Sequence, residues 1–151
     1  MVMQALAFPT FSFTTKSSEK KRFILDPIRK KFVLLTPEEW VRQHVIQDLI
    51  DKGISKTRLR IEKQFEVMGK QKRFDVVVAG ANASIALLIE CKAPEVPITQ
   101  STFDQIARYQ LALNANYLML TNGLQHIYCQ IDYEQQAYHF IPDFPSKVLA
   151  L

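Results

Sequence analysis

The sequence predicts a mixed α/β fold in which a central β-sheet lies between helices. Residues 74–80 ("FDVVVAG") and 85–93 ("IALLIECKA") are apolar at nearly every position, as strands covered on both faces are. Segments with apolar residues at helical spacing precede and follow this strand pair. The chain of 151 residues, 48% of them hydrophobic, has the size and composition of one domain with a buried core.

Residues 1–35 are expected to form an N-terminal arm and basic segment that belongs to the same domain as residues 36–151. Residues 8–13 ("FPTFSF") alternate as a strand or an ordered arm does. Residues 20–32 ("KKRFILDPIRKKF") gather six basic residues around a short apolar core. Both a solvated surface and a phosphate-contacting patch fit this cluster, so its role stays open at this point.

Residues 36–53 ("TPEEWVRQHVIQDLIDKG") predict the first helix. Thr36 is a suitable N-cap, proline is favoured at the position that follows it, and Gly53 can end the helix. Glu39 lies three residues after Thr36 and completes a capping box. The helix is expected to bury an apolar face made of Trp40, Val41, Val45, Ile46 and Leu49.

The rest of the chain alternates between strand and helix patterns. Residues 58–68 ("RLRIEKQFEVM") predict a strand with Leu59, Ile61, Phe65 and Val67 on one side, followed by a turn at residues 69–72 ("GKQK"). After the two apolar strands, residues 99–116 predict a helix from the spacing of Phe103, Ile106, Ala107 and Leu111. A buried strand over residues 117–123 and a C-terminal β-hairpin, 124–132 with 136–143, complete the sheet.

The predicted strand pair brings three ionisable side chains together. A four-residue loop over residues 81–84 would place Gly80 opposite Ile85, and the same antiparallel register would place Asp75 opposite Glu90. Because side chains alternate along a strand, Glu90 and Lys92 share a side, and Asp75 lies on that side as well. Cys91 points to the opposite face and is expected to be a small buried apolar residue.

Two opposed carboxylates repel each other unless a cation lies between them. Asp75 and Glu90 would supply hard oxygen ligands of the kind that Mg²⁺ or Mn²⁺ takes, and the backbone carbonyl of Cys91 would lie near such an ion. Lys92 could then stabilise negative charge that develops on a phosphate. The alternative is structural: Asp75 begins its strand at a turn, and Glu90 forms a salt bridge with Lys92, since a bare ExK pattern is common by chance.

These residues resemble a known family. Asp75, followed by Glu90-Cys91-Lys92 across a strand pair, looks like the PD-(D/E)xK motif of restriction-endonuclease-like nucleases. The segments "DPIRKKFVLLTPEEWVRQ", "KRFDVVV", "ECKAP", "TFDQIARYQ" and "YLMLTNG" resemble, in this order, the N-terminal nuclease domain of type I restriction enzyme R subunits. The resemblance runs from about residue 26 to residue 142. It implies a restriction-endonuclease-like core over residues 36–151.

The resemblance also implies a function and a set of site residues. The function is Mg²⁺-dependent or Mn²⁺-dependent cleavage of DNA phosphodiester bonds, with Asp75 and Glu90 as metal ligands and Lys92 as the catalytic lysine. Gln105 and Tyr109 match the QxxxY motif that follows the core in this branch of nucleases, and residues four apart share a helix face. The alternative is that Tyr109 packs against the sheet while Gln105 faces water.

Residues of the first helix have two explanations each. Family members often carry a glutamate on this helix near the metal, and either Glu38 or Glu39 fits that position, although Glu39 could equally serve as a helix-capping residue. Arg42 could bind phosphate or pair with Glu38.

The sequence departs from the family pattern in two respects. Phe74 replaces the proline of the proline-aspartate pair, at a position that varies in the superfamily. No GxxxxGK[ST] loop occurs, so motor and specificity subunits would have to come from other chains.

The main alternative function is a nucleic-acid-binding or partner-binding module that keeps the fold without catalysis; RNA and branched DNA are alternative substrates. A formal net charge of +4 agrees with a polyanionic partner such as DNA. Two distant cysteines and the absence of an apolar run of about 18 residues predict a cytoplasmic protein without a membrane span. Cutting both strands of a duplex with one site per chain would favour a dimer. No triad or zinc site could be built from the three histidines and two cysteines.

Overall fold

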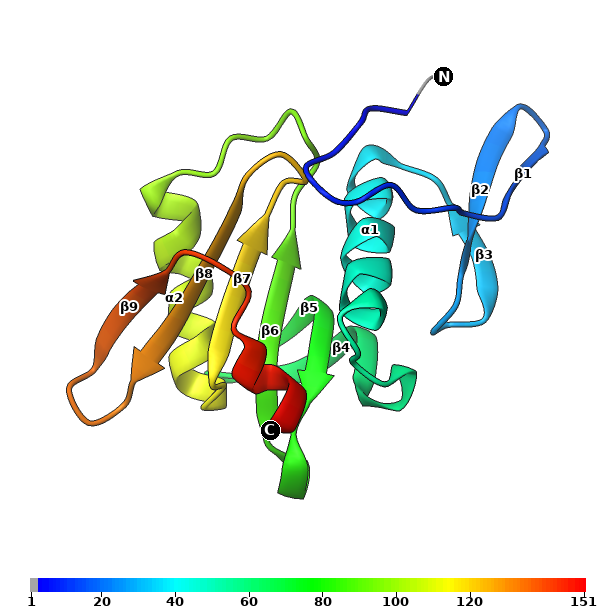
Figure 1. Cartoon of the computed structure of the whole chain (residues 1–151). Coiled ribbons are helices and arrows are strands. Elements are labelled where there is room, and N and C mark those ends of the chain that lie inside the picture. The colour runs from blue at the N-terminus through cyan, green and yellow to red at the C-terminus, as the bar shows by residue number, and fades with distance from the viewer. Residues whose placement is uncertain (1–2) are drawn as a thin grey trace.

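The computed structural model describes residues 3–151, and its two sheets lie on either side of the first helix (Figure 1). The larger sheet has the strand order β4-β5-β6-β7-β8-β9. Its strands are β4 (Leu59–Val67), β5 (Lys70–Ala79), β6 (Ile85–Cys91), β7 (Tyr117–Thr121), β8 (His126–Asp132) and β9 (Ala137–Ile141). The smaller sheet consists of β1 (Thr15–Ser18), β2 (Lys21–Asp26) and β3 (Lys31–Leu34). The predicted mixed α/β sheet with flanking helices is confirmed.

Helix α1 (Pro37–Asp51) begins and ends where the sequence predicts. The Thr36 side chain accepts a hydrogen bond from the Glu39 backbone N–H at 3.0 Å, and Gly53 follows the helix with a left-handed φ of 103°. The capping box is wrong in its second half. The Glu39 carboxylate is engaged by other side chains, and the Thr36 N–H bonds to the Leu34 carbonyl instead.

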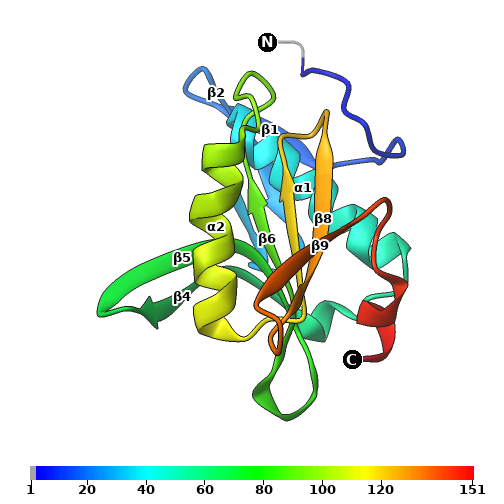
Figure 2. The same cartoon turned by 90° about the vertical axis from the view of Figure 1, so that its left-hand side faces the viewer.

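Helix α1 covers one face of the larger sheet, and α2 (Gln100–Leu113) covers the other (Figures 1 and 2). The α1-side core joins Val41, Val45 and Leu49 to sheet residues such as Ile89. The α2-side core joins Phe103, Ile106 and Ala107 to residues such as Leu88. Neither helix in residues 3–151 has the length and hydrophobicity that a bilayer crossing needs.

The α2 apolar face differs from the prediction at one residue. Thr99 caps the helix and Asn114 ends it with a φ of 56°, but Leu111 is 39% exposed. The buried row instead runs through residues 103, 106, 107 and 110, so Gln110 takes the interior position. One turn of 3.6 residues places position 110 on this row and leaves position 111 beside it. The helix connects β6 to β7, which run parallel, as such a crossover requires.

The β4–β5 hairpin turns earlier than predicted. Met68 and Gly69 form the turn with φ values of 52° and 75°, and Val67 pairs with Lys70, so residues 70–72 already belong to β5. Two successive left-handed residues are typical of a two-residue turn that matches strand twist. The predicted turn over residues 69–72 therefore begins one residue and ends three residues too late.

Strand β4 does not keep its apolar residues on one side. Leu59 and Ile61 pack with the α1-side core, whereas Phe65 packs with the α2-side core. Between them Glu62 has a φ of 54°, a left-handed conformation that interrupts the alternation of a regular strand. The hairpin is consequently long and strongly curved (Figure 2).

The register of β5 and β6 agrees with the prediction near the site and departs from it near the loop. Val76 pairs with Ile89, and the next position in this register places Asp75 opposite Glu90. Nearer the loop, Ala79 rather than Gly80 pairs with Ile85, because Ala86 adds one extra residue on β6. The loop contains a short 3₁₀ turn (Ala81–Ala83); two others lie at Lys56–Arg58 and Ser146–Ala150.

The end of the chain and its beginning complete the fold. Strands β8 and β9 pair antiparallel as the predicted C-terminal hairpin. Residues 8–13 are an ordered arm without strand hydrogen bonding, and the three-stranded sheet that follows was not predicted. The basic segment thus supplies β2 and β3 of a separate antiparallel sheet.

Candidate active site

Asp75 and Glu90 meet where β5 and β6 emerge from the apolar part of the sheet. Both are buried, with exposed fractions of 8% and 5%. The Cys91 backbone N–H donates a hydrogen bond of 2.9 Å to Asp75 Oδ2, which ties the two strands together at this point. The Cys91 side chain lies in the α1-side core, on the face opposite Glu90. Two carboxyl groups therefore share a buried position.

The environment of Glu90 favours its protonated form. Burial is the largest cause that raises the pKa of Glu90 to about 7, and the charge of Asp75 and a hydrogen bond between the two carboxyl groups add to it. Lys72 and Lys92 oppose this rise in pKa. The Lys72 ammonium lies 3.5 Å from Glu90 Oε2. Burial and the charge of Asp75 raise the pKa of Glu38, and the half-buried Lys92 opposes this rise together with Arg42.

Arg42 provides the cation next to Asp75. It lies on α1, is 6% exposed, and donates a hydrogen bond from Nη2 to Asp75 Oδ1. Its Nη1 donates to Glu39 Oε1 at 2.7 Å, and Glu38 lies 3.5 Å away. Burial alone would lower the pKa of Arg42, but Asp75 and Glu39 raise it above its ordinary value. Arg42 therefore pairs with Glu38, one of its two expected roles, and also with three further carboxylates, those of Glu39, Asp75 and Glu62.

Arg29 forms a second cationic centre behind Glu39. Its Nη2 lies 3.0 Å from both Glu39 oxygens, and its Nε lies 2.8 Å from Asp26 Oδ2. The Gln43 amide nitrogen donates to Asp26 at 3.0 Å and to Glu39 at 3.1 Å. Glu39 is thus held by Arg29, Arg42 and Gln43, and this network connects the turn between β2 and β3 to the acid pair.

Glu62 was not among the candidate residues that the sequence indicates, yet it belongs to this network. It lies on β4 opposite Asp75 in the strand register, and its carboxylate is 3.2 Å from Arg29 Nη1 and 3.8 Å from Arg42 Nη2. A left-handed φ on a non-glycine residue stores strain of about 1–3 kcal/mol, and such residues gather at functional sites. The strand pattern of residues 58–68 gives no signal for this conformation.

A cleft of about 520 Å³ opens on the α1 side of the acid pair. Glu38, Glu39, Arg42 and Glu62 line it together with Leu34, Thr36, Pro37, Ala93 and Glu95. Through Arg42, Asp75 is connected to this cleft. The cleft is acidic apart from Arg42, which suits a cation more than a bare anion.

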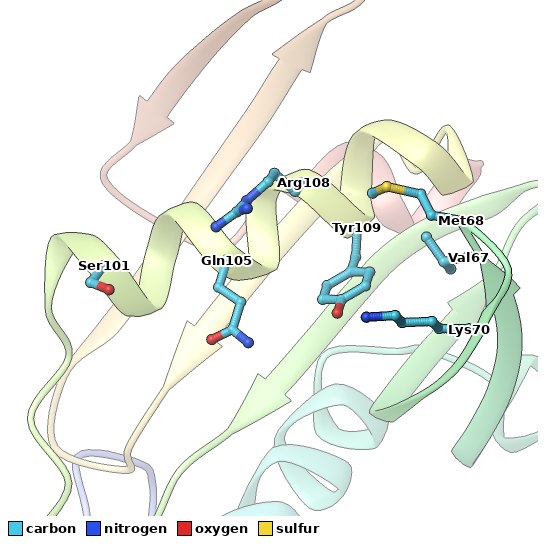
Figure 3. A pocket seen from close by; sticks show the side chains of 7 residues that line it. All are labelled: Val67, Met68, Lys70, Ser101, Gln105, Arg108 and Tyr109. Atoms are coloured by element: carbon cyan, nitrogen blue, oxygen red, sulfur yellow. The ribbon is translucent and has the colours of Figure 1, made fainter.

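Gln105 and Tyr109 lie on the α2 side, in a separate cavity of about 340 Å³. Figure 3 shows both side chains projecting from α2 in the same direction, with the Tyr109 hydroxyl pointing toward Lys70. Tyr109 packs edge-on against Phe74, while Gln105 is exposed. Lys72 connects this cavity to the acid pair, because its ammonium lies 5.4 Å from the Tyr109 ring centre and also contacts Glu90. Gln105 is not brought to Asp75 in this arrangement.

The donor set can be compared with what a divalent cation needs. Within residues 3–151, no group of three or more His, Cys, Asp or Glu side chains is placed to hold a metal ion. Asp75, Glu90 and the Cys91 carbonyl would be two carboxylates and one neutral oxygen, which suit a hard cation that keeps several waters. Burial is the largest cause of the raised pKa of Glu90 and the charge of Asp75 adds to it, and a cation between the two carboxylates would offset both effects. The residues fit such an ion, although Arg42 and Lys72 already contact the carboxylates.

Comparisons with known proteins place these features in context. A family model described as "Type I restriction enzyme R protein N terminus (HSDR_N)" matches residues 37–145. Among solved structures, the chain is similar to a fragment described as an HsdR subunit of a type I restriction enzyme from Vibrio vulnificus YJ016, with a TM-score of 0.54 and 21% sequence identity. That match covers 77% of this chain and 25% of the other, so this chain spans about a quarter of its length. At this identity the likeness concerns the fold alone. No curated protein matches the sequence.

Proposed function

The chain belongs to the family of the type I restriction enzyme R protein N terminus, and from this membership we propose that it is a metal-dependent DNA endonuclease module. The observation that supports the proposal most is the buried pair of Asp75 and Glu90 at the ends of two paired strands. Burying two carboxylates together is costly, and the cost is explained if the pair has a chemical task. The chain would be the nuclease module of a restriction-type system.

Each site residue then has a role. Asp75 and Glu90, with the Cys91 carbonyl, would hold Mg²⁺ or Mn²⁺, which supplies Lewis acidity at a phosphate oxygen and lowers the pKa of a water. Lys92 would stabilise negative charge on the phosphate in the transition state. Glu39 would keep Arg42 oriented, and Arg42 would keep the Asp75 carboxylate in place. Tyr109, through Lys72, would support Glu90 from the α2 side, and Gln105 would contact substrate in the adjacent cavity.

Partners follow from the same family membership. DNA is the proposed substrate, and motor and specificity subunits would be supplied by other chains. Such subunits would deliver the module to DNA, so cleavage by the isolated chain is expected to be weak and of low sequence specificity.

The first test is cleavage of supercoiled plasmid and single-stranded DNA by the purified protein with Mg²⁺, with Mn²⁺ and with a chelator. Asp75→Ala, Glu90→Ala and Lys92→Ala should each lower cleavage by about 10²-fold or more, because each removes a group that acts on the transition state. Asp51→Ala and Lys63→Ala, at exposed positions, are matched controls and should cleave as the wild type does. Chelator-resistant cleavage, or full activity in the three site variants, would refute the proposed site.

A second candidate function is a nucleic-acid-binding or partner-binding module without catalysis. The observation that favours it is the contact of Arg42 with Asp75 and of Lys72 with Glu90, which already supplies each carboxylate with a cation. Under this alternative, neither metal binding by calorimetry nor cleavage of DNA, RNA or branched substrates would be detected. Binding to DNA would remain and would fall steeply with salt.

A further inference from the structure

The three-stranded sheet has one face that the proposed active site does not use. Strand pairing places Lys16 opposite Phe23, Phe23 opposite Leu34, and Leu25 opposite Phe32. Cross-strand partners lie on the same side of a sheet, and so do residues two apart in one strand. We call this side the outer face, made of Lys16, Lys21, Phe23, Leu25, Phe32 and Leu34. The Lys16 ammonium lies 4.2 Å from the centre of the Phe32 ring, which confirms that β1 and β3 share this face.

The other side of the small sheet is turned toward α1. Ile24 is fully buried there, and Asp26, also fully buried, accepts a hydrogen bond from Gln43 of α1. Figure 1 shows this sheet lying along the side of α1 away from the larger sheet. The outer face consequently points away from α1, and on it Leu25 and Leu34 are 36% and 46% exposed while both phenylalanine rings are half-buried.

Positive charge surrounds this apolar face. Residues 15–34 contain two acidic residues, Glu19 and Asp26, and the Asp26 carboxylate is bonded to Arg29. The same residues contain seven basic ones. Lys16 and Lys21 lie on the outer face, and Lys20 and Lys30 lie in the turns at its ends. Arg22 and Lys31 lie on the side that carries Ile24 and Asp26, and Arg29 is paired with Asp26, Glu39 and Glu62. The lysines of this group are all exposed. Aromatic rings in the middle of a sheet and lysines at its edges form the arrangement on which unpaired bases stack while their phosphates meet cations.

We propose that the outer face of the small sheet binds single-stranded DNA, with bases against Phe23 and Phe32 and phosphates near Lys16 and Lys21. In a duplex the bases are stacked within the helix, so the rings would have no free base to contact. A second copy of the chain would bring the same lysines against each other, and like charges would oppose that contact. Charge complementarity thus favours a polyanion with exposed flat rings.

The face leads to the cleft beside the acid pair. Leu34, the last residue of β3, belongs to the outer face and also lines the cleft that contains Glu38 and Arg42. A strand bound along the face would therefore lie next to this cleft. Its phosphates would enter the acidic cleft only with the proposed metal ion bound, so this step rests on the proposed nuclease function, whereas binding to the face does not.

The test is fluorescence anisotropy of a short labelled oligodeoxythymidine, in chelator so that nothing is cleaved. The double variant Phe23→Leu with Phe32→Leu keeps apolar side chains but removes both rings, and should weaken binding roughly tenfold to a hundredfold. Phe140→Leu, at an aromatic residue that is 59% exposed on β9, is the matched control and should bind as the wild type does. Lys16→Gln with Lys21→Gln should reduce the slope of log affinity against log salt by about 1.4, and Lys63→Gln with Lys147→Gln should not.

Several outcomes would overturn the proposal. One is unchanged affinity in the double phenylalanine variant, and another is equal binding of a duplex. Tighter binding of oligouridine would assign the face to RNA instead. Dimers seen by analytical ultracentrifugation, lost in the phenylalanine variant while DNA binding is absent, would assign it to a second copy. Binding is measured in chelator and cleavage is measured with metal, so a failed nuclease proposal and a failed binding proposal give different results.

Discussion

Arg42 lies inside α1 with its guanidinium surrounded by carboxylates from three elements: Glu38 and Glu39 of α1, Glu62 of β4 and Asp75 of β5. Its Nε has no hydrogen-bond partner and is buried. The guanidinium thus neutralises part of the negative charge around it, although its Nε–H is left without an acceptor. Removing one partner of a buried ion pair leaves an uncompensated charge, which is far more costly than the pair itself is stabilising.

Arg42→Met should lower the free energy of unfolding by about 3–5 kcal/mol, because Asp75 would keep a buried charge without its cation and Glu39 would lose one of its two arginine partners. Urea denaturation measures this loss. Asp75→Asn alone should also lower the free energy of unfolding. Because the two side chains contact each other, the loss in the double variant Arg42→Met with Asp75→Asn should be smaller than the sum of the two single losses. Arg60→Met is a control at an exposed arginine. Strict additivity in this double-mutant cycle would contradict the assigned contact.

Part of the site could be predicted from the sequence, whereas the network of ion pairs around it could not. The juxtaposition of Asp75 and Glu90 follows from counting residues across a short loop, because β5 and β6 are neighbours in sequence and in space. The contacts of Arg29 with Glu39 and Glu62 join residues 10 and 33 positions apart. No local pattern encodes them. The capping box was enough to explain a glutamate at position 39 from the sequence. The structure shows that its carboxylate instead accepts hydrogen bonds from Arg29 and Arg42.

The β4–β5 hairpin shows how an element can depend on backbone conformation more than on side-chain contacts. Gly69 has a φ of 75°, and a Cβ added there would meet no atom within 4 Å. Met68 also has a left-handed φ and is 71% exposed. The residue preference of this turn is thus set by the left-handed φ values and not by side-chain packing. Asparagine followed by glycine is the pair that this turn type prefers.

Met68→Asn should therefore stabilise the protein, by about 0.5–1 kcal/mol, because asparagine tolerates the left-handed region better than methionine does. Gly69→Ala should destabilise it by about 1–2 kcal/mol, since alanine is strained there. Thermal unfolding of both variants gives the two signs in one experiment. Gly53→Ala is a comparison at another left-handed glycine with no atom near its Cβ. If Met68→Asn were destabilising, the methionine side chain would have a packing role that its exposure does not indicate.

Periodicity identified the elements better than it identified their faces. Helix α1 and strands β6 to β9 lie where the apolar patterns and caps place them, because those signals are local, whereas β5 begins at Lys70, inside the predicted turn. The face assignment failed at β4, where Glu62 breaks the alternation, and at Leu111 of α2, where Gln110 is the buried residue. Both failures come from tertiary packing. Strand β4 curves so that its residues contact both cores, and the buried row of α2 is set by how the helix packs on the sheet.

The whole molecule includes an N-terminal portion that lies before the matched family region, which begins at residue 37. The small sheet was not visible in the sequence, since its strands are short and rich in charge. Residues 8–13 were expected as a strand or an ordered arm, and residues 3–13 form an arm over α1. The Ala7 N–H donates to the Gly123 carbonyl at 2.7 Å, and the Trp40 indole N–H donates to the Gln4 carbonyl at 2.8 Å.

Aromatic packing holds this arm in place. Phe13 lies against Trp40 and His44, with ring centres 5.1 Å and 4.8 Å apart, and Phe8 lies 4.5 Å from the His126 ring. The His126 Nε2 must donate its hydrogen to the Ala7 carbonyl, 2.7 Å away, since a carbonyl can only accept. Burial lowers the pKa of His44, so this histidine is kept neutral beneath the arm.

A chain that lacks residues 1–13 should expose Trp40 and the surface of α1 that Leu6 and Phe8 cover. Each apolar side chain returned to water removes about 1.5–3 kcal/mol of stabilisation, so the free energy of unfolding should fall by about 3 kcal/mol or more. Trp40 is the single tryptophan, so its native emission should shift to longer wavelength, and urea denaturation can be followed by the same signal.

Gly123→Ala tests the same contact within the full chain. Gly123 has a φ of 86°, and a Cβ there would lie 2.9 Å from Leu6 and 3.0 Å from Val41. The variant should therefore loosen the arm and reproduce part of the emission shift, whereas Gly53→Ala, which strains the backbone equally but lies away from the arm, should lower stability without moving the emission. An unchanged emission maximum in the truncated chain would mean that the arm does not cover Trp40 in solution. The small sheet and α1 would then have to stabilise each other without it.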